Sequence, residues 1–261
     1  MRTQLLDPIP VLGVFVLFAV ITLVFYEIGF RIGRWWQDRL PGEQEGPTDM
    51  LVGSLLALMA FLLAITMGMA SDRFDARRGL VLEEANAIQA VYLQAGYLPP
   101  AQTDQMRELV REYATLRIAS SDQARVMENA SISESLHRDM WAIQEEVVQT
   151  GYNPDIMSSF GDTLTDLITI HERRIVAGMY SRVPQTVLIL LLAGSALSLA
   201  MVGYSAGLAG KRSVLSAVVM VVALGAVLVL VIDLDRPQDG FLTVSQQPLI
   251  DVQRVIGAPT P

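Results

Sequence analysis

Four long apolar runs, two on each side of a polar middle, limit what this chain can fold into. They cover residues 8–30, 50–70, 184–209 and 214–232. Each is about 20 residues long, and a helix of that length, with about 1.5 Å of rise per residue, crosses a hydrocarbon core of about 30 Å. No run carries a charged residue near its centre, since Glu27 lies at the edge of the first. The sequence therefore predicts an all-α integral membrane protein with four spans.

The polar middle, residues 71–183, is expected to be an extramembrane bundle of helices. It contains 11 Arg against 17 Asp and Glu, a net charge of −6, and this acidic balance argues against nucleic acid as a partner. Apolar residues continue at helical spacing from the second span through Val81, Ala85 and Ile88 to Tyr92. One long helix is therefore expected to leave the membrane and enter the bundle.

The remaining segments complete a four-part division of the chain. Residues 1–70 hold the first two spans, 71–183 the bundle, 184–232 a hairpin of the third and fourth spans, and 233–261 an extended polar tail with room for a short helix. Further helices are expected at 102–118 and 133–148, and a stripe from Ile156 is expected to run on into the third span. No useful stretch has the period of two that marks a strand. Arginines near the loops can be counted for either orientation, so the side of the bundle stays open.

The densest cluster of charges follows the second span. Its members, with one aromatic residue among them, are Asp72, Arg73, Phe74, Asp75, Arg77 and Arg78. One interpretation is the charged vestibule of a pore, and the other is an exposed helix surface with ion pairs such as Asp75 to Arg78, three residues apart. Spacing alone favours the second. Asn86 lies on the apolar stripe, where a buried amide would fix helix register or line a polar lumen.

Histidine, aspartate and glycine supply the other candidate sites. His171 lies on an apolar stripe and is expected to be a core residue rather than a metal ligand or pH sensor. Asp233, Asp235 and Asp239 could form an oxygen cage for a divalent ion, although aspartates beside Arg236 are more often paired or solvated. The pattern from Gly203 to Gly207 predicts close helix contact.

Several stretches together resemble the bacterial bestrophin-like family. They are residues 69–78 (Met-Ala-Ser-Asp-Arg-Phe-Asp-Ala-Arg-Arg), 84–88 (Glu-Ala-Asn-Ala-Ile), 171–174 (His-Glu-Arg-Arg) and 233–237 (Asp-Leu-Asp-Arg-Pro). The resemblance covers about residues 48–250. It implies a multi-pass protein of the bacterial inner membrane, with family-motif residues at Glu84, Asn86, Asp233, Asp235, Arg236 and Pro237 besides the charged cluster.

A more distant similarity links this family to the true bestrophins, which are homopentameric ion channels with a pore lined by the second span. It implies a homo-oligomer, a pentamer by analogy, that conducts small ions. Candidate pore-lining residues in the second span are Ser54, Leu62, Ile65, Thr66 and Gly68. The bestrophins have a polar Arg-Thr-Asn element in this span, whereas this chain has the mostly apolar residues 63–68 there, so anion conduction is not implied.

The sequence leaves two functions open. One is an ion channel of unassigned selectivity, with Glu83, Glu84 and the acidic middle favouring cations near the mouth. The other is a non-conducting membrane scaffold or sensor whose helical middle binds a partner. An enzyme is not expected, because the chain has no phosphate-binding glycine loop, metalloprotease motif or nucleophile elbow. No cofactor or metal is expected, and the absence of cysteine excludes disulfides.

Overall fold

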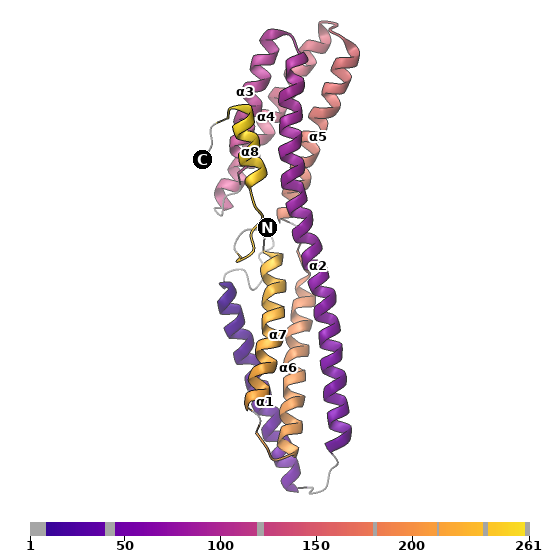
Figure 1. Ribbon diagram of the computed structural model, residues 1–261, viewed down its shortest axis with the longest axis vertical. Coiled ribbons are helices and arrows are strands. Elements are labelled where there is room, and N and C mark those ends of the chain that lie inside the picture. Colours follow the sequence, from indigo (N-terminus) through magenta and orange to yellow (C-terminus); the bar gives the residue numbers. More distant parts are fainter. Residues whose placement is uncertain are drawn as a thin grey trace. The chain divides into compact units, whose positions relative to one another are not determined.

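The computed structural model describes residues 9–39, 45–118, 123–179, 182–212, 214–236 and 240–258, and these contain helices and no strand (Figure 1). The α-helices are α1 (Val11–Arg39), α2 (Glu45–Gln94), α3 (Pro100–Leu116), α4 (Gln123–Gln149), α5 (Pro154–Met179), α6 (Gln185–Leu208), α7 (Val214–Asp235) and α8 (Gln247–Ile256), with the 3₁₀-helix η1 (Ala95–Tyr97) after α2. Four of them, α1, α2, α6 and α7, are long and apolar enough to cross a membrane. The predicted all-α, four-span class is confirmed.

The chain divides into two compact units, which we describe separately. The membrane unit consists of Met1–Arg73, Arg182–Arg236 and Gly240–Leu242. The bundle unit consists of Phe74–Ser181, Pro237–Asp239 and Thr243–Pro261. Helix α2 contributes to both units, and the division falls after Arg73.

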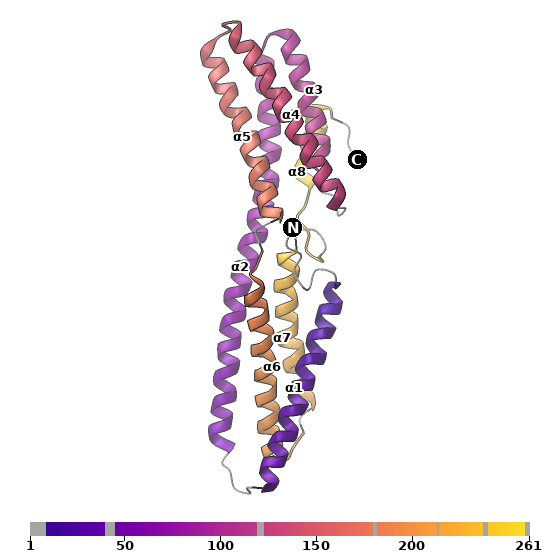
Figure 2. The ribbon, with the colours of Figure 1, turned by 180° about the vertical axis from the view of Figure 1, so that it is seen from behind.

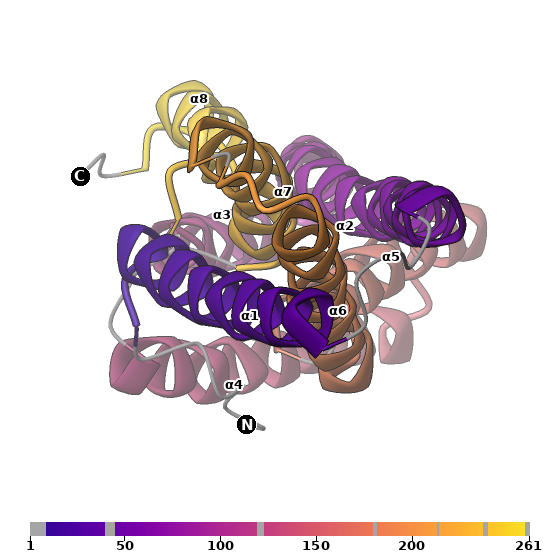
Figure 3. The same ribbon diagram turned by 90° about the horizontal axis from the view of Figure 1, so that it is seen from below.

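In the membrane unit, α1, α6 and α7 pack against one another (Figure 3). Gly29 and Gly33 of α1 and Gly203 and Gly207 of α6 lie where these two helices cross. A Cβ atom added at Gly203 would lie 2.1 Å from the carbonyl oxygen of Tyr26, so only glycine allows the backbones to come this close. The helix contact predicted from Gly203 and Gly207 is confirmed, and its partner is α1.

The described residues of the bundle unit share an apolar core. Helix α3 contacts α4, α8 and η1, and α4 contacts α5, which lies beside it (Figure 2). Fully buried side chains include Ile88, Met106, Met140, Phe160 and Leu164. Along α5, the buried residues Met157, Phe160, Leu164 and Leu167 recur at steps of three or four, so this helix buries one stripe and leaves its other face exposed.

One expectation about helix limits is wrong. The stripe from Ile156 does not continue into the third span, because α5 ends at Met179 and α6 begins at Gln185. Pro184 precedes α6, and a proline disfavours helical geometry in the residue before it. The tail contains the short helix that the sequence allowed, α8, which buries Leu249 and Ile256 on the bundle core.

Candidate functional site

The candidate pore-lining residues of α2 divide between two faces of the helix. Ser54, Ile65 and Gly68 are exposed, and Leu62 is half-buried. Thr66 is only 2% exposed, and its hydroxyl donates to the carbonyl oxygen of Leu62 at 2.7 Å. Because Thr66 is buried within one chain, it does not share the exposed face.

Helix α2 meets the rest of the membrane unit through its opposite face. Asp49 accepts a hydrogen bond from the Ser205 hydroxyl of α6 at 2.6 Å. Met59 is buried, and its sulfur lies so near Gly194 of α6 that a Cβ added there would be 2.4 Å away. The exposed face of α2 therefore has no partner among the described residues of the chain and is available to lipid, water or another subunit.

The charged cluster after the second span is also divided. Asp72, Asp75 and Arg78 are exposed, Arg73 and Phe74 are half-buried, and Arg77 is buried. Within the described residues, Asp75 and Arg78 form no ion pair, although the three-residue spacing would allow one. The two aspartates thus present their charges outward, whereas two of the three arginines are turned at least partly inward.

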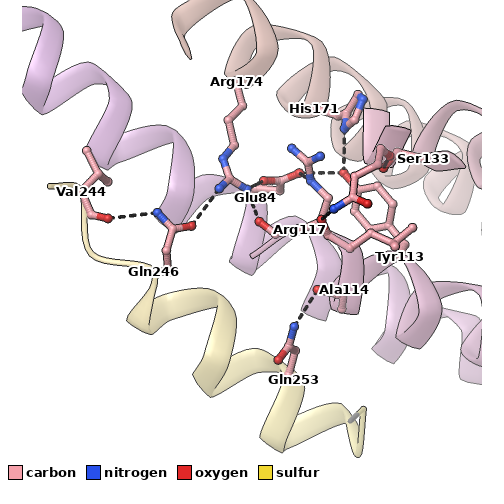
Figure 4. Close-up of polar contacts among 12 residues, drawn as sticks. Glu84, Tyr113, Ala114, Arg117, Ser133, His171, Arg174, Val244, Gln246 and Gln253 are labelled. Carbon is pink, nitrogen blue, oxygen red and sulfur yellow. Dashed lines mark hydrogen bonds and ion pairs between the residues drawn. The ribbon is translucent and has the colours of Figure 1, made fainter. Parts of the chain in front are cut away.

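Glu84 is the centre of a buried polar cluster in the bundle unit (Figure 4). Its side chain is fully buried, and one carboxylate oxygen accepts hydrogen bonds from Arg117 Nε at 2.6 Å and from the Tyr113 hydroxyl at 2.7 Å. Its other oxygen accepts from Arg174. Arg174 also donates to Gln246 at 2.9 Å. The cluster thus joins α2, the end of α3, α5 and the residue before α8.

Two histidines extend this cluster. The rings of His137 and His171 lie edge to face with centroids 4.8 Å apart, and both pack on Tyr113. The Tyr113 hydroxyl has one proton and donates it to Glu84, so its oxygen accepts from His171 Nδ1–H at 3.2 Å. The expected core position of His171 is confirmed, but its Nε2 has no hydrogen-bond partner among the described residues.

Burial and the two arginine charges determine the protonation states of Glu84 and the two histidines. Burial alone would raise the pKa of Glu84, but the charges of Arg117 and Arg174 outweigh it and lower that pKa to about 2. Burial, with repulsion from Arg117, lowers the pKa of His171 to about 3 and that of His137 to about 4. Near neutral pH the cluster therefore holds one carboxylate, two guanidinium groups and two uncharged imidazoles.

Neither this cluster nor the exposure of Asn86 is predicted by the sequence pattern. Asn86 was expected on the buried stripe but is exposed. Glu84, two residues earlier, is buried instead. The signal was present: Glu84 lies three residues after Val81 and four before Ile88, which places a carboxylate on the buried stripe. A charge there requires partners, and the arginines that supply them come from other helices.

The aspartates of the tail hold chain segments together. Both carboxylate oxygens of Asp233 accept backbone N–H groups, from Phe241 at 2.8 Å and Leu242 at 2.9 Å. Asp235 accepts the N–H of Val183 at 2.7 Å. No group of acidic or histidine side chains that could hold a metal occurs in the described part of the chain, which does not include Asp239. Pro237, the last residue of the family motif, also lies outside the described residues.

Arg236 completes this arrangement in the membrane unit. Its guanidinium Nη2 donates to the carbonyl oxygen of Ile9, just before α1, at 2.6 Å. Asp233 therefore binds the segment after the fourth span. Asp235 binds the residue before the third span, and Arg236 binds the residues before the first span. Their hydrogen bonds favour the paired interpretation of this motif over a metal cage.

Comparisons with known proteins agree with this fold. Two variants of a bacterial Bestrophin homolog from Klebsiella pneumoniae have similar structures, with TM-scores of 0.67 and 0.66 at 15% and 14% identity. Each match covers 94% of this chain, and 95% and 97% of the respective homolog. A further structure, described as a membrane protein, has a TM-score of 0.64 at 15% identity and covers 94% of this chain and 97% of its own.

At such low identity these structures establish the fold alone. No curated protein matches the chain. The family model described as Bestrophin-like domain matches residues 13–249, which is most of the sequence. The protein therefore belongs to the Bestrophin-like family.

Proposed function

We propose that this protein is a homo-oligomeric ion channel of the bacterial inner membrane, with the exposed face of α2 lining the pore. The observation that carries the proposal is that this face has no partner among the residues that the structure describes. Ser54, Phe61, Ile65 and Gly68 are all exposed on it. At about 100° per residue, these four positions lie within roughly 60° of one another around the helix. Copies of α2 around an axis would bring this narrow face to a shared lumen.

The residues on this face suit a gated pore. Ser54 and Gly68 are small and leave room for water, whereas Ile65 and Phe61 could close the lumen by excluding water from a narrow apolar ring. Leu62 lies at the side of the face. The buried Thr66 is not part of the lining that we propose.

Ion selectivity is not assigned. Asp72 and Asp75 are exposed on α2 beyond the span, and acidic rings attract cations to a pore mouth. Glu84 does not contribute to this attraction, because its charge is neutralised by Arg117 and Arg174 inside the bundle. The sign of the permeant ion is therefore left to measurement.

Cysteine accessibility gives a sharp test, because the natural chain has no cysteine. Purified Ile65→Cys protein in planar bilayers should conduct, and its current should change when a charged, water-soluble thiol reagent is added. Val219→Cys is the matched control: Val219 of the spanning helix α7 is 58% exposed against 47% for Ile65, but is not on α2. Reversal potentials in asymmetric KCl then give the selectivity.

The results separate the two functions that the sequence leaves open. Modification that alters current through Ile65→Cys but not through Val219→Cys supports the α2-lined channel. Equal effects of modification on current at both positions would refute the assignment of α2 as the pore-lining helix. Silence from a verified, reconstituted oligomer across pH and calcium concentration would favour a non-conducting scaffold or sensor.

A further inference from the structure

The segment Gly240–Leu242, which follows the fourth span, presents two apolar side chains away from the protein. Phe241 is 79% exposed and Leu242 is 42% exposed. We call these two residues the apolar tip. Two adjacent large apolar side chains in water are unfavourable, since each leaves its surface unburied. Covering the tip with an apolar partner would therefore be favourable.

The backbone of the tip is held in place. The N–H groups of Phe241 and Leu242 each donate to a different oxygen of the Asp233 carboxylate. Asp233 itself is only 3% exposed. A Cβ added at Gly240 would lie 2.5 Å from Asp233 Oδ1, so glycine is what allows the chain to approach. The exposure of the tip is thus a property of a fixed loop whose amide groups are already satisfied.

The position of Asp233 fixes the depth of the tip. Asp233 lies in the last turn of α7, one of the four helices that can span the membrane. The same end of the membrane unit holds Val183, bound to Asp235 before α6, and Ile9, bound to Arg236 before α1. Three spans therefore begin or end here, which marks this level as a boundary of the bilayer.

We propose that the apolar tip inserts into the bilayer beside the fourth span, at the level where headgroups meet acyl chains. The partner is lipid, because the medium around the end of a spanning helix at this level is the bilayer itself. Insertion is favoured because the tip carries no charged side chain and its two N–H groups already have acceptors, so no unpaired amide at these positions enters lipid. Asp233 is the residue that positions the tip.

Fluorescence quenching tests the proposal on the full chain in phosphatidylcholine vesicles. Phe241→Cys is labelled with an environment-sensitive dye and exposed either to lipid carrying a nitroxide near its headgroup or to aqueous iodide. Val219→Cys, in a span, provides the lipid reference, and Asp139→Cys, at an exposed acidic position of the bundle, provides the water reference. The Phe241→Cys label should be quenched by the nitroxide lipid to within about twofold of the lipid reference, and weakly by iodide.

Each other outcome overturns the proposal. Strong quenching by iodide would place the tip in water, and protection from both quenchers would mean that a second protein subunit covers it. Leu242→Cys supplies an independent second position and should behave like Phe241→Cys. Asp233→Asn, which exchanges one accepting oxygen for an amide group, should shift the Phe241→Cys label from nitroxide towards iodide quenching. None of these readings requires the protein to conduct ions.

Discussion

At the residue scale, the neighbouring acids Glu83 and Glu84 allow an exposed ion pair to be compared with a buried one. Glu84 is fully buried between Arg117 and Arg174, whereas Glu83 is exposed and pairs with Arg173 at 3.4 Å. Removing one partner of a buried ion pair leaves uncompensated charge and costs about 3–5 kcal/mol, whereas an exposed pair contributes up to about 1 kcal/mol. Two adjacent positions thus differ in energetic weight because their side chains point about 100° apart around one helix, one to solvent and one into the bundle.

We therefore expect Glu84→Gln to lower the Tm of the detergent-solubilised protein by roughly 6–20 °C. The matched variant Glu83→Gln removes the same charge from the surface and should change the Tm by at most a few degrees. Thermal unfolding followed by circular dichroism measures both. Equal shifts for the two variants would show that Glu84 is not paired as described.

The buried histidines make stability depend on pH. Their pKa values are lowered from 6.5 to about 3 for His171 and to about 4 for His137 in the folded protein. Below pH 6.5 the histidines of the unfolded chain therefore bind protons, whereas those of the folded chain stay uncharged. Folding stability should therefore decrease as pH falls from 6.5 towards 4, by about 1.4 kcal/mol per pH unit for each histidine. Glu84 acts in the same direction below pH 4.5, because its folded pKa is about 2.

The measurement is the Tm of the solubilised protein between pH 7.5 and pH 5. The double variant His137→Gln and His171→Gln should flatten the dependence in this window, in which Glu84 is mostly ionised in both the folded and the unfolded state. His137 and His171 are the only histidines in the chain, so no other imidazole can account for the slope. An unchanged slope in the double variant would refute the assignment.

What the sequence could predict at this scale was limited by long-range pairing. Periodicity places Glu84 on the buried stripe with Ile88, but it does not show which side chains neutralise the carboxylate there. The partners Arg117 and Arg174 are 33 and 90 residues away from Glu84. Their convergence depends on the packing of α3 and α5, which no local pattern encodes.

At the scale of elements, apolar length and periodicity carried most of the information. The four spanning helices were predicted because membrane length and hydropathy are local properties. The interruption before Pro184 was not predicted, and the short helix allowed in the tail had no predicted limits. An amphipathic helix as short as Gln247–Ile256 is marginal alone and forms here because Leu249, Val252 and Ile256 are buried on the bundle core.

The crossing of α1 and α6 leads to a prediction at the same scale. Gly203→Ala places a methyl group 2.1 Å from the Tyr26 carbonyl oxygen, where only movement of the backbone can relieve the clash. Such overpacking costs about 1–3 kcal/mol, so the variant should lower the Tm and the yield of folded protein. Gly53→Ala is the control, because no atom lies within 4 Å of its added Cβ. A Tm loss of similar size in both variants would contradict the glycine crossing.

At the scale of the whole molecule, the proposed channel requires more than one chain. Helices α1, α6 and α7 are packed together, and the exposed face of α2 encloses nothing by itself. A lumen requires several copies around an axis, and closed rotational symmetry lets each copy present the same face. The distant similarity to bestrophins suggests five copies, which would have five times the 28.6 kDa mass of the chain.

We predict that native mass spectrometry of the detergent-extracted protein shows one closed homo-oligomer, with a pentamer expected from that similarity. Ser54→Cys gives an independent measurement, because copies whose α2 faces meet around an axis should form disulfide-linked dimers under mild oxidation. Val219→Cys, exposed on α7, should not cross-link at the same rate. A monomer in both measurements would count against the oligomer and against the pore, because the exposed face of α2 would then be left to lipid alone.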